Sequence, residues 1–149
     1  MTPVNRDVPA LQAALAVEHA AVYGYGLLGA RVQGGQQVAV ANVWNVHKAR
    51  RDRLAQLITG LGGRPVAAQP AYKLPVQVTS PGTAVQLAAA LEGSLPEAYM
   101  GLAGAADPSL RRLAAQAMQD AVTRQIRWGG HPPDTAFPGL TAAELAPRS

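Results

Sequence analysis

A proline-rich stretch in the middle of the chain limits the possible folds more than any other feature of the sequence. GGRPVAAQPAYKLPVQVTSPG, residues 62–82, carries Pro65, Pro70, Pro75 and Pro81. Each proline lacks a backbone donor and restricts the residue before it, so this stretch cannot be helical. Extended chain spans about 3.3 Å per residue, enough to run the length of a 25-residue helix of about 37 Å. We expect the stretch to connect opposite ends of a helical domain.

Helical patterns lie on both sides of this stretch. Hydrophobic residues recur every three or four positions, which is typical of helices that bury one face. Glycines at 34–35 and 62–63 and the pair Asp107-Pro108 mark helix ends. The predicted helices span about residues 7–32, 37–61, 82–105 and 108–128, followed by a tail, 129–149, that we expect to pack Phe137 and Leu140 onto the helices. Short links make antiparallel pairs, so residues 1–149 form one all-α domain, a four-helix bundle with one long crossover.

Composition and charge exclude several classes of protein. A net charge of +4 could suit nucleic acid, but the basic residues are scattered and aromatic residues are only 5%, so no nucleic-acid partner is expected. No apolar run approaches the roughly 20 residues that cross a bilayer. The first residues, MTPVNRDVPA, lack the pattern of a secretory signal, which predicts a cytoplasmic protein with no membrane association. With no cysteine, disulfides, zinc–thiolate sites and cysteine nucleophiles are excluded.

Polar residues interrupt the hydrophobic face of each predicted helix. Glu18 lies on the first face, His47 on the second and Glu92 on the third, while Asp120 lies on or beside the fourth. Antiparallel pairing places these side chains near mid-height of the bundle. Buried carboxylates cost several kcal/mol each unless they are paired or bind a metal. These residues therefore define a candidate metal site or a buried ion-pair cluster.

This arrangement resembles the ferritin-like di-iron carboxylate proteins. Those proteins use one Glu from each of two helices and a Glu-x-x-His from each of the other two, a ligand set that suits Fe or Mn. Glu18 and Glu92 match the single glutamates and His47 matches one histidine. Trp44 stands where the glutamate before His47 would be, and the fourth helix has no Glu-x-x-His. The resemblance implies an incomplete metal site of Glu18, His47, Glu92 and Asp120.

More narrowly, the chain resembles a small bacterial ferritin-like domain family of unknown function. The features that carry this resemblance are EHAAVYGYG and HKARRDRL in the first two helices, AYKLP in the crossover, LEGSLPEAY in the third helix, and WGG and FPG near the end. They cover nearly the whole chain. The resemblance implies a fold and no particular reaction.

Nearby arginines offer a second interpretation of the same residues. Arg50 and Arg51 lie near the level of Glu18, and Arg124 lies near Glu92, so either carboxylate can form a buried ion pair in place of a metal bond. His47 can hydrogen-bond to Glu18 instead of binding a metal. Asp120 and Arg124 are four residues apart and can pair along their own helix.

Two functions remain open at this stage. The first is a non-catalytic bundle without a cofactor, acting as a homodimer or by binding a protein or a small molecule between the helices. The alternative is an Fe- or Mn-dependent oxidoreductase that uses Glu18, His47, Glu92 and Asp120. Glycines in EHAAVYGYG indicate close approach of another helix, and the tyrosines around them are expected in the core with bonded hydroxyls.

Overall fold

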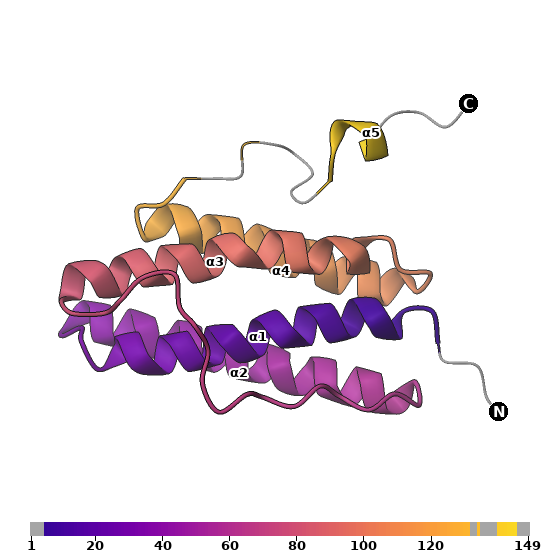
Figure 1. Cartoon of the computed structure of the whole chain (residues 1–149), viewed down its shortest axis with the longest axis horizontal. Helices are drawn as coiled ribbons and strands as arrows, with labels where there is room; N and C mark the ends of the chain where they lie inside the picture. The colour runs from indigo at the N-terminus through magenta and orange to yellow at the C-terminus, as the bar shows by residue number, and fades with distance from the viewer. Residues whose placement is uncertain (1–4, 132–133, 135–139, 146–149) are drawn as a thin grey trace.

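The fold is all-α. The computed structural model describes residues 5–131, 134 and 140–145, and over that part it contains helices and no strand: α1 (Val8–Gly29), α2 (Gly35–Gly60), α3 (Pro81–Ala103), α4 (Pro108–Arg127) and a short α5 (Ala142–Leu145) (Figure 1). The four-helix prediction is confirmed, and α5 was not predicted. Within the described residues, no helix is both long and apolar enough to cross a membrane.

The helix ends follow the sequence signals closely. α1 ends at Gly29, three residues before the predicted end at 32, and every other long-helix boundary lies within two residues of its predicted position. Asp107 caps α4 by accepting a hydrogen bond from the Ser109 backbone at 2.8 Å. Ser80 caps α3 in a reciprocal capping box with Thr83. Of the tail residues expected to pack, Leu140 is half-buried and Phe137 lies outside the described residues.

The crossover joins the two helical hairpins as predicted. It runs beside the α1–α2 hairpin and then crosses to the start of α3 (Figure 1). Its first residues are held by α1: Gln12 Nε2 donates to the Arg64 carbonyl at 2.6 Å, and the Val66 backbone donates to Gln12 Oε1 at 2.8 Å. A ring nitrogen of His19 lies 2.9 Å from the Val66 carbonyl. These bonds fix an extended segment that has no helical hydrogen bonds of its own.

Two hydrophobic clusters fill the bundle. α1 packs on α2 and α3, and α3 packs on α4. One cluster includes Leu11, Leu15, Leu54, Ile58, Leu95, Tyr99 and Leu102. The other includes Tyr25, Leu28, Val40, Leu87, Leu91 and Trp128. Along α1 the first cluster comes before Glu18 and the second after it, and along α3 the order is reversed around Glu92. A polar layer therefore separates two apolar cores.

The helices of the two hairpins approach closely at Gly24 of α1. A Cβ atom at this position would lie 2.5 Å from Cδ1 of Leu91 on α3, so a larger residue would displace that leucine. The glycine thus allows α1 and α3 to pack at the level of the polar layer, in agreement with the close approach expected from the sequence.

Candidate functional site

The polar layer brings together residues from three helices. Glu18 of α1, His47 of α2 and Glu92 of α3 are fully buried. His47 lies between the two carboxylates: Nδ1 is 2.7 Å from Glu18 Oε2 and Nε2 is 2.9 Å from Glu92 Oε1. The residues that interrupt the first three hydrophobic faces therefore meet inside the bundle.

Two buried tyrosines donate further hydrogen bonds to these carboxylates. The Tyr25 hydroxyl donates to Glu92 Oε1 at 2.6 Å, and the Tyr99 hydroxyl donates to Glu18 Oε1 at 2.5 Å. Trp128 Nε1 donates to the Tyr25 hydroxyl at 3.2 Å. The result is one chain of hydrogen bonds that runs from Trp128 through the polar layer to Tyr99.

His47 is an imidazolium in this arrangement. A neutral imidazole has one N–H donor and one lone pair, whereas both ring nitrogens here face carboxylate oxygens and both need a proton. Burial alone would lower the pKa of His47. The hydrogen bonds and negative charges of Glu18 and Glu92 outweigh burial and raise the pKa to about 9. The cation therefore persists at neutral pH.

The tyrosines remain neutral donors over the same range. Burial is the largest cause that raises the pKa of Tyr25 and Tyr99 well above the ordinary value, and the adjacent carboxylate charge raises it further. Each hydroxyl therefore keeps its proton and donates a hydrogen bond to a carboxylate.

Arg124 of α4 adds a second cation to the layer. Its side chain is 11% exposed, and its Nη1 lies 3.9 Å from Glu92 Oε2. Within residues 5–131, 134 and 140–145, neither of these two atoms has a hydrogen-bond partner. Glu18 and Glu92 are thus offset by His47 and Arg124, and the four groups sum to no net charge.

Asp120, Arg50 and Arg51 lie outside this cluster. Arg50 Nη2 contacts Asp120 Oδ2 at 3.2 Å, joining α2 to α4, and the Asp120 side chain is 37% exposed. Arg51 pairs with its neighbour Asp52 at 2.9 Å. Glu18 is therefore paired by His47 and Tyr99 rather than by either arginine, and Asp120 pairs with Arg50 rather than with Arg124. Of the predicted arginine pairs, the structure retains the one between Arg124 and Glu92.

Trp44, at the position where the resemblance places a metal-binding glutamate, packs against α1. Its Nε1 donates to the Val22 carbonyl at 2.9 Å, and its ring faces Gly26 and lies under the Lys48 ammonium at 3.7 Å from the ring centroid. These contacts stabilise the α1–α2 hairpin and bring no ligand to the cluster.

The arrangement of donor atoms does not fit a metal ion. Among the described residues, no group of three or more His, Asp or Glu side chains is placed to hold one. A metal-binding imidazole needs a free lone pair, and both His47 nitrogens point at carboxylates. Only Glu18, His47 and Glu92 correspond to ligands of a di-iron site, which has six. The remaining charged group of the layer, Arg124, is a cation and cannot bind a metal.

The sequence contains a signal for the tyrosine bonds that the helical pattern alone misses. In both α1 and α3 a tyrosine follows the glutamate by seven residues, Glu18–Tyr25 and Glu92–Tyr99, which places each pair on one face two turns apart. Because α1 and α3 are antiparallel, each tyrosine meets the glutamate of the other helix. Trp128 follows Arg124 by four residues and so falls on the inner face of the fourth helix, but this spacing does not indicate its bond to Tyr25.

The fold and the polar layer place the chain among all-α bundle proteins with a buried charged centre. A family model, Domain of unknown function (DUF4439), matches residues 10–142. The chain belongs to this family.

A solved structure supports the same relationship. The crystal structure of a conserved hypothetical protein, Rv2844, from Mycobacterium tuberculosis is 33% identical in sequence, with a TM-score of 0.78 over 83% of this chain and 94% of that chain. No curated protein matches this sequence. The family match at residues 10–142 includes the helices that form the polar layer, and neither comparison assigns a reaction.

Proposed function

We propose that this chain is a non-catalytic ferritin-like bundle in which a cluster of histidine, carboxylates and arginine stands in place of a metal centre, and that it acts by binding another molecule. The observation that carries this proposal is that both His47 ring nitrogens are bonded to carboxylates, at 2.7 and 2.9 Å. An imidazolium cannot bind a metal until it loses a proton.

The ferritin-like relationship is supported by the order of the helices and the origin of the three central residues. A hairpin, a long crossover and a second hairpin give one of the known bundle connections. The single glutamates come from α1 and α3 and the histidine from α2, as in the di-iron pattern. Kinship of this kind supports the fold and leaves the chemistry to the residues present.

Charge also favours the metal-free interpretation. The cluster is already neutral with His47 and Arg124 as its cations. A divalent ion beside Glu92 would lie next to a guanidinium and an imidazolium, and in a buried site such repulsion is weakly screened. Metal binding would require one of these cations to be lost or moved.

Accessibility favours binding over catalysis. Glu18, His47 and Glu92 have no exposed surface, so a substrate cannot touch them in this conformation. The cluster holds the helices in place, and we assign function to surfaces outside it. The partner that this proposal implies is a small ligand or a second copy of the chain. Light scattering would detect a dimer of two copies.

One observation favours the alternative, a metal-dependent oxidoreductase. Glu92 Oε2 is buried and has no hydrogen-bond partner in the part of the chain that the structure describes, which leaves one carboxylate oxygen available. In this second candidate Glu18, His47 and Glu92 would bind Fe or Mn after His47 lost its proton and turned.

Elemental analysis separates the two candidates. Protein purified without added metal, and protein incubated anaerobically with Fe(II) or Mn(II) and then desalted, should contain less than stoichiometric metal. Retention of one or more ions per chain in either sample would overturn the proposal.

The variant Glu18→Gln provides an independent measurement on the metal-free protein. We expect a loss of about 3–5 kcal/mol in the free energy of unfolding, because His47 and Tyr99 both lose a charged partner in a buried site. A loss below about 1 kcal/mol would indicate a carboxylate that awaits a metal rather than one that pairs a cation.

A further inference from the structure

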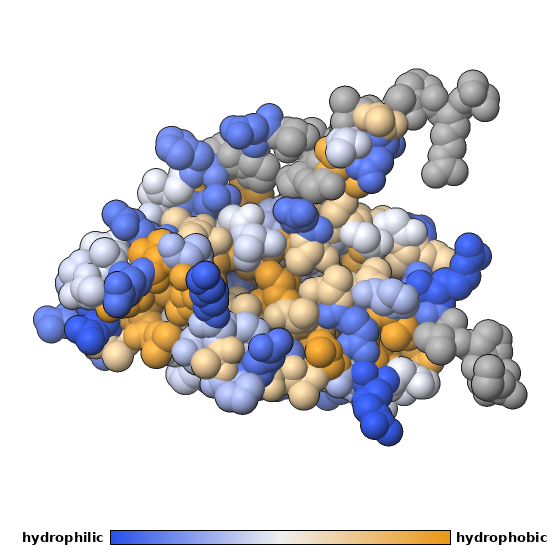
Figure 2. Space-filling view, viewed as in Figure 1, coloured by the Kyte–Doolittle hydropathy of each residue, from blue (hydrophilic) through white to orange (hydrophobic). Residues whose placement is uncertain are grey.

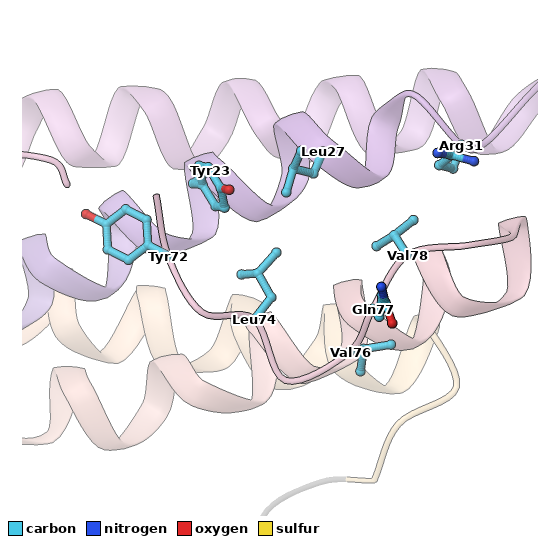
Figure 3. A pocket seen from close by; sticks show the side chains of 8 residues that line it. All are labelled: Tyr23, Leu27, Arg31, Tyr72, Leu74, Val76, Gln77 and Val78. Carbon is cyan, nitrogen blue, oxygen red and sulfur yellow. The ribbon is translucent and has the colours of Figure 1, made fainter. Parts of the chain in front are cut away.

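A surface groove lies between α1 and the crossover, away from the polar layer. It encloses about 340 Å³, within the usual size range of small-ligand sites, and is lined by Tyr23, Leu27, Arg31, Tyr72, Leu74, Val76, Gln77 and Val78. Figure 3 shows these side chains along one edge of α1 and the facing part of the crossover.

Two periodic rows of side chains form the walls. Tyr23, Leu27 and Arg31 are four residues apart and follow one face of α1 and the turn after it. In the crossover, residues 72, 74, 76 and 78 are half-buried while 71, 73, 75 and 77 are exposed, the alternation of an extended chain. Leu27 remains 46% exposed, so the apolar wall is open to a ligand.

The ends of the groove differ in character. At one end the Tyr23 and Tyr72 rings contact each other, with centroids 5.5 Å apart. At the other end lies Arg31, two residues past the end of α1. Figure 3 shows the aromatic pair and Arg31 at opposite ends with Leu27 and Leu74 between them.

The charge around the groove is positive. Arg31 is exposed and forms no ion pair within the part of the chain that the structure describes. No Asp or Glu occurs in residues 19–51 or 53–91, which include the second half of α1 and the whole crossover, whereas Arg64 and Lys73 lie in the crossover. Figure 2 shows hydrophobic residues on this face beside hydrophilic ones.

We propose that this groove binds a small amphipathic carboxylate, such as a medium-chain fatty acid, with the carboxylate on Arg31 and the hydrocarbon along Leu27 and Leu74 toward the tyrosine pair. The guanidinium can hold a carboxylate through two parallel hydrogen bonds. The apolar walls remove the hydrocarbon from water. This inference names the ligand class for the binding function proposed above and rests on it.

Calorimetric titration with decanoate below its micelle concentration tests the site on the full chain. Wild type should bind one decanoate, and decanol should bind at least tenfold more weakly because it lacks the charge. Arg31→Gln should weaken decanoate about tenfold and leave decanol unchanged. Leu27→Trp, a larger side chain at an exposed position, should abolish binding of both.

Arg112→Gln, which removes an exposed arginine of α4, is the matched control and should leave binding unchanged. The inference is overturned if decanoate does not bind at millimolar concentration, if decanol binds as tightly as decanoate, or if Arg112→Gln weakens binding as much as Arg31→Gln. Amide NMR shifts confined to α1 and the crossover would confirm that Leu27→Trp acts locally.

The metal analysis distinguishes failure of this inference from failure of the proposed function. Stoichiometric Fe or Mn with normal decanoate binding would overturn the metal-free assignment and retain the groove. Absence of both metal and decanoate binding would overturn the groove alone.

Discussion

Two ion-pair regions of this bundle use neighbouring residues of α2 and differ mainly in burial. His47 lies between Glu18 and Glu92 with none of these side chains exposed, whereas Arg50, three residues later, pairs with an Asp120 that is 37% exposed. Both regions join separate helices through opposite charges. Water reaches the second pair mainly through Asp120, since the Arg50 side chain is 15% exposed, while the first has only protein groups to offset its charges. The difference indicates that a charged residue on a helix face contributes strongly to stability only where it is buried together with its partners.

Removal of the central cation should have the largest effect. In His47→Leu, Glu18 and Glu92 lose their shared partner inside the bundle, and we expect a loss of about 3–5 kcal/mol in the free energy of unfolding. Urea denaturation followed by circular dichroism measures it. A loss under about 1 kcal/mol, similar to that expected for exposed pairs, would remove the contrast between the two regions.

The pH dependence of stability should report the same cation with a slightly smaller effect. The pKa of His47 is about 9 in the folded protein, against about 6.5 when unfolded. Because the folded state holds this proton more tightly, the contribution is complete below pH 6.5 and is lost as the pH rises through 9. The loss should be roughly 3 kcal/mol.

Urea midpoints between pH 6 and 9.5 measure this loss, and His47→Gln is the control that should show a flatter profile. Two slowly exchanging ring N–H protons on His47 at pH 7, seen by NMR, would identify the imidazolium directly. A single ring N–H at that pH would contradict it.

The tyrosine hydroxyls should rank next. Tyr25→Phe and Tyr99→Phe each remove a hydrogen bond to a buried carboxylate, which is worth about 1.5–3 kcal/mol. Tyr25→Phe also leaves Trp128 Nε1 without its acceptor, so it should cost more than Tyr99→Phe. Tyr72→Phe is the matched control, because that hydroxyl accepts one bond from the Gln69 backbone at the surface.

Unfolding free energies of the three phenylalanine variants test the ranking. Equal losses of unfolding free energy in all three variants would show that burial does not strengthen the bonds of Tyr25 and Tyr99.

The part-buried pair of Arg50 and Asp120 should have the smallest effect. Asp120→Asn and Arg50→Gln should each cost less than about 1 kcal/mol, and this cost should shrink further in high salt. Denaturation of both variants at low and high salt checks this. A cost above that of Tyr99→Phe, or one that salt leaves unchanged, would mean that the pair is more strongly coupled to the buried cluster than its exposure indicates.

Most of the fold could be predicted from local signals. These signals are the prolines in residues 62–82, the Asp107-Pro108 cap and the glycines at helix ends. Each acts on the backbone of residues next to it in the sequence, so its effect can be predicted without knowing the tertiary structure. The extent of α1 was overestimated because no strong stop precedes Gly34. The short α5 has no hydrophobic periodicity of its own to predict it.

The site was predictable only in part, since partner choice depends on the distances between helices. Helical spacing places Glu18, His47 and Glu92 on the hydrophobic faces of their helices, and the structure brings these residues together. The same spacing gives no information on whether Arg50 reaches across to Asp120 or to Glu18, because that depends on how far α2 and α4 are separated. Helical spacing places Trp128 on the inner face at the end of the fourth helix, but it gives no information on its bond to the Tyr25 hydroxyl.

The reciprocal bonds between Glu18, Tyr99, Glu92 and Tyr25 have a consequence for how the two hairpins align. A leucine- and alanine-rich interface would let α1 slide along α3 by one turn, about 5.4 Å, and still bury its apolar surface. Such a shift would break both tyrosine bonds together and leave the Glu18 and Glu92 carboxylates buried without these donors. The polar layer therefore selects one alignment of the hairpins and discriminates against slipped, misassembled bundles.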